Sequence, residues 1–121
     1  MQNPYQKYMQ QSVTTMTPVQ LVVALYDKSI LELNKAVYFI EQKNIPKAHG
    51  SIMRVTEIVD TLDAHLKDKY EISENLAALY QFFRENLIKA NIKKDPEIIK
   101  MLVPYFTELK EAFEEISKKG F

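Results

Sequence analysis

The chain of 121 residues carries 16 basic and 16 acidic side chains, two glycines and no cysteine. The lack of cysteine excludes disulfide scaffolds, thiolate zinc sites and cysteine nucleophiles. The balanced charge argues against a general nucleic-acid binder, which needs surplus basic residues to displace counterions from phosphates. Two glycines are too few for a turn-rich β fold, because such folds use glycine wherever φ must be positive.

The length suits one domain, so we expect a single helical domain over residues 1–121. The longest purely apolar run, Leu21–Leu25, is far shorter than the roughly 20 residues that span a bilayer. No charged segment followed by an apolar one opens the chain, so a secretory signal peptide is not expected.

Capping signals predict where the helices begin. Thr17 precedes a proline and stands three positions before Gln20, which is the spacing of a capping box. Asp95 also precedes a proline. Asn44 and Ser73 are weaker start signals of the same kind. The four signals predict four helices, over residues 18–42, 46–68, 74–92 and 96–118.

Apolar residues recur three and four positions apart within each predicted helix, as expected of helices that bury one face. The predicted seam of the first helix is Val23, Tyr26, Ile30, Leu33, Val37 and Ile40, and that of the second is Ala48, Ile52, Val55, Val59, Leu62 and Leu66. The third seam is Leu76, Tyr80, Phe83, Leu87 and Ala90, and the fourth is Ile98, Leu102, Tyr105, Leu109, Ala112 and Ile116. Short loops make consecutive helices antiparallel, so the expected fold is all-α, an antiparallel up-down four-helix bundle.

Two residues disagree with uninterrupted helices. Gly50 lies inside the second predicted helix, where it either permits a close helix approach or marks a frayed start. Pro104 lies inside the last helix, where proline removes a backbone hydrogen bond. We expect the last helix to be kinked near Val103 or broken into two helices.

The sequence offers little for catalysis. His49 and His65 lie 16 positions apart on one predicted helix, about 24 Å along its axis, so they cannot share a metal ion. The Glu-x-x-His pairs of di-iron bundles, phosphate-binding glycine loops and nucleophile elbows are all missing from the sequence. We therefore expect no enzyme activity, no catalytic residues, no metal site and no cofactor.

The helices carry more apolar residues than one seam requires. The surplus residues are Leu21, Leu25, Leu31, Tyr38 and Phe39 in the first helix, Leu79, Phe82, Ile88 and Ile92 in the third, and Ile99, Met101 and Val103 in the fourth. One explanation is a buried stripe wider than the strict seam. The other is an apolar groove that receives an amphipathic partner helix.

Residues 1–16 are expected to form a mobile N-terminal arm or a short helix. Tyr5, Tyr8, Met9 and Val13 fall at helical spacing, but so short and polar a segment cannot hold a helix by itself. It is either a disordered tail or a segment that lies in a groove of the bundle with its tyrosines as anchors.

Two sets of residues between positions 3 and 95 form an ordered pattern. The N-terminal set consists of Asn3-Pro4-Tyr5, Tyr8, Ser12-Val13, Thr15, Thr17-Pro18, Leu21, Leu25-Tyr26 and Ala36. The second set consists of Asn75-Leu76-Ala77-Ala78-Leu79-Tyr80, Leu87 and the run from Ala90 to Asp95. No single element is specific, but the ordered pattern extends over most of the chain and resembles that of the flagellin export chaperone family, FliS.

The resemblance implies a cytoplasmic flagellar secretion chaperone that binds flagellin. In that family the disordered C-terminal segment of flagellin lies as helices in apolar grooves of the chaperone. Binding prevents premature polymerisation and supports type III export during flagellum assembly. The resemblance also implies that the N-terminal segment occupies part of the binding surface, and that the export apparatus or a co-chaperone is a further partner.

The helix geometry and the resemblance together assign candidate residues. We expect Leu21, Leu25, Leu31, Leu79 and Phe82 to line the partner-binding groove, and Tyr5 and Tyr8 to form a displaceable N-terminal cap. The expected oligomeric state is a monomer or weak homodimer, with no nucleic acid and no membrane insertion. The alternative hypothesis is a structural helical bundle that self-associates through the same apolar surface and has no flagellin client.

Overall fold

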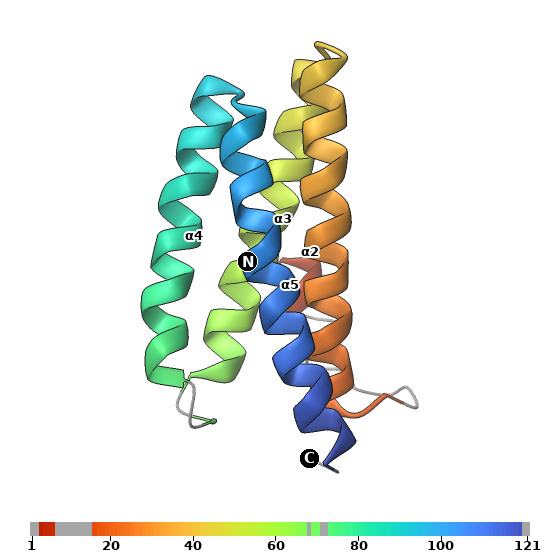
Figure 1. Ribbon diagram of the computed structural model, residues 1–121, viewed down its shortest axis with the longest axis vertical. Helices are drawn as coiled ribbons and strands as arrows, with labels where there is room; N and C mark the ends of the chain where they lie inside the picture. The colour runs from red at the N-terminus through yellow and green to blue at the C-terminus, as the bar shows by residue number, and fades with distance from the viewer. Residues whose placement is uncertain (1–2, 7–15, 68, 71–72, 120–121) are drawn as a thin grey trace.

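The computed structural model describes residues 3–6, 16–67, 69–70 and 73–119 (Figure 1). Its four long helices are α2 (Pro18–Glu41), α3 (Ile45–Leu66), α4 (Ser73–Lys93) and α5 (Pro96–Lys118). Their ends lie within two residues of the predicted ones. No strand occurs among the described residues, and residues 4–6 form a short helical turn. The predicted all-α, up-down helical bundle with a short N-terminal helix is confirmed.

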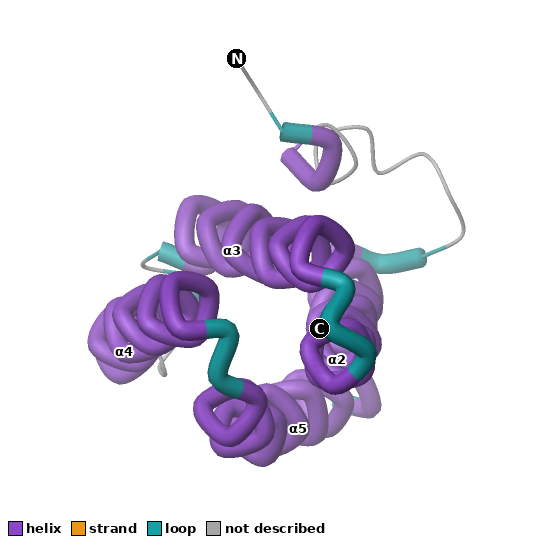
Figure 2. The backbone as a smooth tube through the Cα atoms, turned by 90° about the horizontal axis from the view of Figure 1, so that it is seen from above, coloured by secondary structure: helices purple, strands orange, loops and turns teal. Residues whose placement is uncertain are grey.

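The helices form a ring in chain order when the bundle is viewed along its axis (Figure 2). α2 packs against α3 and α5, and α4 completes the ring by packing against the same two helices. The short loops place consecutive helices side by side, and the contact between α2 and α5 closes the ring. In the described part of the chain, none of the helices has both the length and the hydrophobicity to span a membrane.

The helix ends are fixed by the predicted caps. Thr17 Oγ1 accepts a hydrogen bond from the Gln20 N–H at 3.2 Å, and Gln20 Oε1 accepts one from the Thr17 N–H at 2.9 Å. Asn44 and Asp95 cap α3 and α5 in the same way through their side-chain oxygens. These bonds satisfy N–H groups that the first turn of a helix leaves without partners.

Aromatic side chains fill the centre of the bundle. The rings of Phe83 and Phe106 stack with their centroids 4.4 Å apart, and Tyr26 stacks on Phe113 at 5.7 Å. The hydroxyl groups of Tyr26 and Tyr80 lie 2.6 Å apart. The aromatic residues therefore join three of the helices, α2, α4 and α5, across the interior.

The predicted seams are fully buried in two helices and only partly right in the other two, where most of the predicted residues are only partly buried. All predicted seam residues of α3 and α4 are buried. In α2 the buried residues are Val19, Leu21, Val22, Leu25, Tyr26, Ser29, Glu32, Leu33 and Ala36. The buried stripe therefore includes Tyr26 and Leu33, as predicted, but most of its other residues lie on the opposite side of these two from the predicted Val23, Ile30 and Val37. In α5 they are Ile99, Leu102, Phe106 and Phe113, whereas the predicted Tyr105 and Ala112 are exposed.

Pro104 and Gly50 both lie inside helices. α5 runs from Pro96 to Lys118 with Pro104 inside it, so the irregularity expected near Pro104 is a local break within one helix rather than a division into two helices. The interruption is in the hydrogen-bond ladder, because proline has no N–H to donate. Gly50 is in the second turn of α3, and a Cβ built there would meet only the Arg54 guanidinium, at 3.7 and 3.9 Å. Gly50 therefore does not mark a close approach of two helices.

Candidate docking surfaces

The N-terminal turn, residues 3–6, is held against α3 by Asn3. Asn3 Oδ1 accepts hydrogen bonds from the N–H groups of Tyr5 and Gln6, both at 3.0 Å, so Asn3 caps its own turn. The same oxygen accepts a bond from Thr61 Oγ1 at 3.2 Å, and Asn3 Nδ2 donates to the Glu57 carbonyl at 3.4 Å. One side chain thus shapes the turn and docks it. The turn lies beside α3 in the view along the bundle axis (Figure 2).

Tyr5 is the side chain by which the turn reaches the core. Its ring is partly buried and packs against the hydrophobic cluster. It borders a hollow of about 330 Å³ together with Pro4, Ala24, Leu25 and Lys28. Burial raises the pKa of the Tyr5 phenol, and Lys28 opposes that rise. The turn therefore covers the part of α2 where Leu25 lies.

A buried carboxylate lies beside the turn. Glu32 is 1% exposed, and Lys28 Nζ lies 3.0 Å from its Oε2. Arg54 and Lys35 lie 3.6 and 3.8 Å from Oε1, which accepts no hydrogen bond. Burial alone would raise the pKa of Glu32, but the polar and cationic groups around it, Lys28 foremost, hold this pKa below its ordinary value. Glu32 is therefore a charged group in the wall between α2 and α3.

The five predicted groove residues do not line one groove. Leu21 and Leu25 are 2% and 3% exposed and belong to the core, with Leu25 beneath Tyr5. Leu31 is 52% exposed on the outside of α2. Leu79 and Phe82 lie partly buried on α4. The surplus apolar residues thus divide between the two explanations: some widen the buried stripe, and others remain on the surface.

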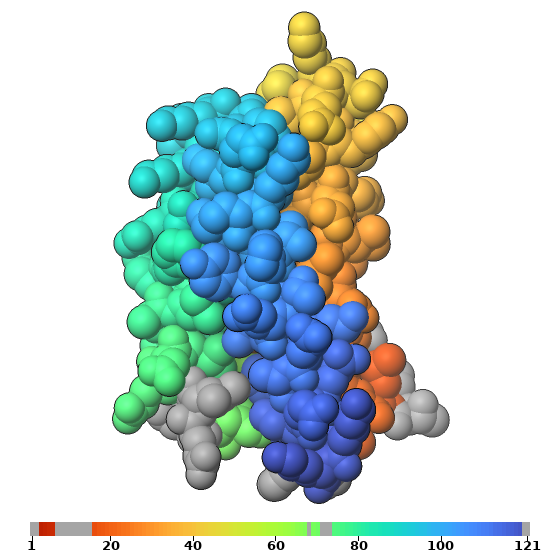
Figure 3. Space-filling view, in the orientation of Figure 1, coloured from red at the N-terminus to blue at the C-terminus, as the bar shows by residue number. Residues whose placement is uncertain are grey.

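A second apolar surface lies where α4 meets α5. The rings of Phe82 and Tyr105 pack edge to face with their centroids 5.2 Å apart. Leu79 is on the same face of α4 one turn earlier, and Tyr105 is 39% exposed. Figure 3 shows this face of the molecule, with α5 between α4 and α2. Tyr105 was missed as a surface residue because the predicted seam placed it in the core.

Further exposed apolar residues lie at the end of the bundle away from the N-terminal turn. Ile88 and Ile92 on α4 are 59% and 78% exposed, and Tyr38 on α2 is 58% exposed. The sequence marked all three as surplus to the seam. Ile88 and Ile92 lie one turn apart on α4, whereas Tyr38 lies on α2, which is diagonal to α4 in the ring.

The predicted cap is only partly described. Tyr5 borders the same hollow as Leu25, whereas Tyr8 falls outside the described residues. Whether the turn is displaced by a partner therefore remains a prediction.

The described residues provide no site for metal chemistry. No group of three or more His, Asp or Glu side chains comes close enough to hold an ion in the described ranges. His49 Nδ1 lies 3.0 Å from Asn91 Nδ2, which links α3 to α4. Burial and the charge of Lys69 lower the pKa of His65. The surroundings of both histidines are thus groups of the helical bundle itself.

Comparison with known proteins identifies the family. The family described as Flagellar protein FliS matches residues 1–120. The Flagellar secretion chaperone FliS of Bacillus subtilis is 29% identical over 114 residues, covering 94% of this chain and 86% of the relative. The protein of the same name from Salmonella typhimurium is 29% identical over 112 residues, covering 90% and 83%. That of Vibrio cholerae is 28% identical over 102 residues, covering 83% and 75%. The chain therefore belongs to the FliS family of flagellar secretion chaperones.

Proposed function

We propose that this chaperone binds flagellin. It holds the disordered C-terminal segment of flagellin, prevents premature polymerisation in the cytoplasm and supports type III export for flagellum assembly. Membership of the family supports the proposal, since relatives covering most of the chain are named flagellar secretion chaperones. The chemistry requires neither a catalytic group nor a cofactor, because masking a surface needs only binding.

The observation that carries the proposal is the docked N-terminal turn. A short peptide of the chain itself lies over Leu25 and is held by the two Asn3 contacts with α3 and the packing of Tyr5. A contact of this size stabilises the docked state only modestly, since a hydrogen bond contributes about 0.5–1.5 kcal/mol net. A client segment that buries more apolar area can therefore displace it.

The exposed apolar residues supply the rest of the binding surface. A segment that folds on binding loses conformational entropy, so it must bury a large area. Each fully buried Leu or Phe anchor contributes about 1.5–3 kcal/mol before that loss. We assign Leu31, Leu79 and Phe82 to direct contact, and Leu21 and Leu25 to the surface uncovered when the turn leaves. A client that uses all of them must wrap around the bundle.

Calorimetry with a peptide from the C-terminal end of flagellin tests the proposal. The full chain should bind the peptide, and a chain lacking residues 1–15 should bind it more tightly because no turn has to be displaced. Circular dichroism checks that the shortened chain keeps its helices. No heat with either chain would refute flagellin binding, and equal affinities would refute displacement of the turn.

Surface variants test the assigned contacts. Leu31→Asp is informative because Leu31 is 52% exposed and its loss should leave the fold intact. The expected result is at least a tenfold loss of peptide affinity, about 1.4 kcal/mol. Ala77→Asp, at an exposed position of α4, is the matched control and should bind normally. Leu25→Asp is unsuitable, because a charge at a position 3% exposed would unfold the bundle.

Self-association is the second candidate function. The exposure of Ile88 and Ile92 favours it, since apolar side chains on adjacent turns of α4 could meet those of another copy. Light scattering distinguishes the two functions. A stable oligomer that forms with increasing concentration and ignores flagellin would support self-association, and a monomer that binds flagellin would exclude it.

A further inference from the structure

A second hollow lies between α2 and α3, away from the N-terminal turn. It measures about 420 Å³, and α2 contributes Lys35 and Phe39 to its wall. The wall on the α3 side is formed by Pro46, Lys47, Gly50 and Arg54. The lining thus contains three cationic side chains and no acidic one. We call this site the basic hollow.

The basic hollow has an excess of positive charge. Glu32 is the carboxylate closest to it, and its nearest cation is Lys28, at 3.0 Å. Arg54 and Lys35 contact the same carboxylate only at 3.6 and 3.8 Å. Three cations around one carboxylate leave two positive charges uncompensated in this cluster, and both belong to side chains that line the hollow.

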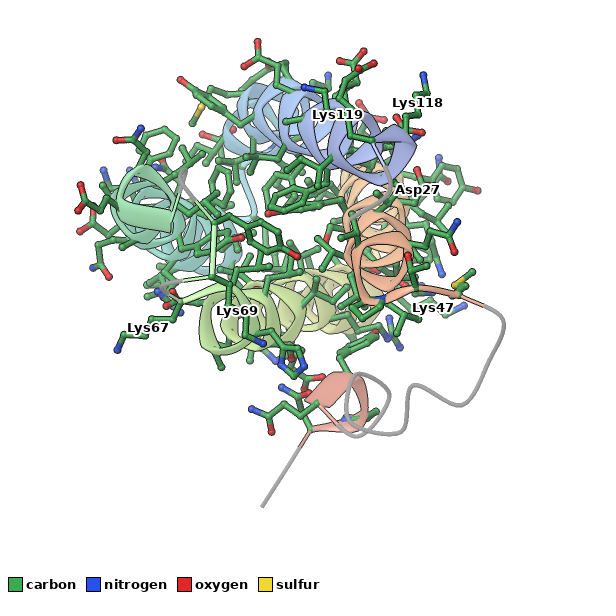
Figure 4. The ribbon with its side chains drawn as sticks, turned by 90° about the horizontal axis from the view of Figure 1, so that it is seen from below. Asp27, Lys47, Lys67, Lys69, Lys118 and Lys119 are labelled. Atoms are coloured by element: carbon green, nitrogen blue, oxygen red, sulfur yellow. The ribbon has the colours of Figure 1, made fainter. Side chains whose placement is uncertain are left out.

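Lys47 adds a further positive charge, at a position where the dipole of α3 disfavours it. It lies in the first turn of α3, and the Asn44 side chain accepts a hydrogen bond from its N–H. A positive charge there opposes the helix dipole, which favours acidic residues at the N-terminus. The Lys47 Nζ lies 5.7 Å from the centre of the Phe39 ring, over the hollow. Figure 4 shows Lys47 on the outside of the bundle.

Gly50 keeps the hollow open. A Cβ at this position would reach only the flexible end of Arg54, at 3.7 and 3.9 Å, so packing between helices does not require glycine there. Glycine in a helix interior is less stable than alanine. The lack of a side chain at residue 50 leaves an open space between Lys35, Lys47 and Arg54.

The neighbouring part of the same face already holds a peptide. The N-terminal turn lies against Ala24, Leu25 and Lys28, and the charges of Glu32 and Arg54 act on the Tyr5 phenol. Arg54 therefore lies within electrostatic reach of the docked turn while it lines the basic hollow. A peptide can follow this face from one hollow to the other, and Phe39 and Pro46 offer it apolar contact. These features favour a peptide over a nucleic acid or a membrane surface.

We propose that the basic hollow binds an acidic segment of a protein partner. Carboxylates of that segment pair with Arg54, Lys47 and Lys35, and an apolar side chain packs on Phe39 in the space above Gly50. The inference does not depend on flagellin being the client, because the charges and the space are properties of this chain alone.

Nuclear magnetic resonance titration of the full chain tests the proposal. The probe is a synthetic helical peptide with leucine on one face and glutamate on the other, compared with the same peptide carrying glutamine for glutamate. The glutamate peptide should shift the amide signals of residues 35–54 and bind at least tenfold more tightly at low salt. The preference should shrink as salt rises, because screening weakens exposed ion pairs.

Three variants locate the site. Gly50→Leu fills the hollow and should abolish binding while the unfolding midpoint stays the same or rises. Lys47→Glu should weaken the glutamate peptide about fivefold or more, since it replaces attraction with repulsion. Lys89→Glu, at an exposed position of α4, is the matched control for total charge and should have little effect.

Several results would overturn the proposal. They are equal binding of the two peptides, no binding of either, normal binding by the Gly50→Leu variant, or signal shifts confined to other residues. Two further probes are phosphatidylglycerol vesicles, which represent a membrane, and heparin, which represents a polyanion. Binding of either at residues 35–54, as tight as the glutamate peptide, would show a site for membranes or polyanions instead.

Discussion

The hydroxyl groups of Tyr26 and Tyr80 form a buried hydrogen bond between α2 and α4, 2.6 Å long. Burial raises the pKa of both phenols far above the neutral range, so both stay uncharged. Tyr80→Phe should lower the free energy of unfolding by about 1–3 kcal/mol, because it leaves the Tyr26 hydroxyl buried without its partner. Urea denaturation monitored by circular dichroism measures the change.

The double variant Tyr26→Phe/Tyr80→Phe is the control for this pair. Removing both hydroxyls leaves no unpaired group, so the double variant should be no less stable than Tyr80→Phe alone. If instead the free-energy costs of Tyr26→Phe and Tyr80→Phe add up to the cost of the double variant, the hydrogen bond contributes nothing and the prediction is wrong.

Glu32 should make stability depend on pH in the acid range. Its folded-state pKa lies below the ordinary value of 4.5, so its stabilising contribution is fully present above pH 4.5. The contribution is lost as the pH falls through the folded-state pKa, where the carboxylate must take up a proton. Glu32→Gln should therefore be less stable than the native chain at pH 7, and the gap should narrow below pH 4.5.

Thermal unfolding of both chains from pH 7 to pH 3 measures this gap. Glu108→Gln, at an exposed position of α5, controls for the general loss of negative charge. A gap between the native and Glu32→Gln chains that stays constant down to pH 3 would contradict the assignment. A gap that widens would mean that Glu32 is harder to ionise in the folded protein.

The sequence could not predict that Glu32 and Ser29 are buried. Apolar periodicity counts polar residues as exposed, yet Glu32 is 1% exposed and Ser29 is fully buried. Each has a local contact one turn earlier in the helix: Ser29 Oγ donates to the Leu25 carbonyl, and Glu32 Oε2 pairs with Lys28. Asn3, by contrast, was recognised only as part of a family motif. Its role as cap and anchor requires the distance to Thr61, which only the folded chain provides.

At the level of the helices, the seams that were predicted wrongly share a cause. In a helix with heptad spacing, one row of apolar residues is buried together with one of the two rows beside it. The spacing of apolar residues alone does not show which of the two neighbouring rows is buried. In α5 the shared row includes Leu102, and the choice lay between Tyr105 and Phe106. The larger and wholly apolar flank, with Phe106 and Phe113, is the buried one, so side-chain chemistry could have decided.

In α2 the same rule would have failed. The buried flank contains Ser29 and Ala36, which are smaller than the predicted Ile30 and Val37. Opposite them, α3 also buries small residues, including Ser51. Small side chains let two helix backbones approach closely, and such pairing becomes visible only when the neighbour is known. The boundaries of all four helices were nevertheless predictable, because caps and prolines are local signals.

Gly50→Ala should stabilise α3. The added methyl group meets only the Arg54 side chain at van der Waals distance, so no strain opposes the gain in helix propensity. The expected increase in the free energy of unfolding is about 0.5–1 kcal/mol. Urea denaturation checks it, with Ala78→Gly at an exposed position of α4 as the reverse control, expected to destabilise by a similar amount. A loss of stability in the Gly50→Ala chain would show that the backbone there needs glycine.

At the scale of the whole molecule, the N-terminal turn is docked on the helical bundle through Asn3 and Tyr5. The sequence indicated this arrangement through Tyr5, although the covered site, beside Leu25 and against α3, could not be located without the structure. If a client uses the same site, its apparent dissociation constant is the intrinsic one divided by the fraction of chains in which the turn is free. Weakening the turn should therefore tighten client binding.

Asn3→Ala tests this linkage with one substitution. It removes the bond from Thr61, the bond to the Glu57 carbonyl and the cap of the turn. A loss of about 1.4 kcal/mol in docking corresponds to a tenfold change in the docking equilibrium, so affinity for a C-terminal flagellin peptide should rise by up to about tenfold. Hydrogen exchange at the amides of residues 3–6 should rise in parallel, because the free turn is unprotected. Asn75→Ala, an exposed asparagine on α4, should change neither quantity. Faster exchange without tighter binding would show that the turn and the client occupy different surfaces.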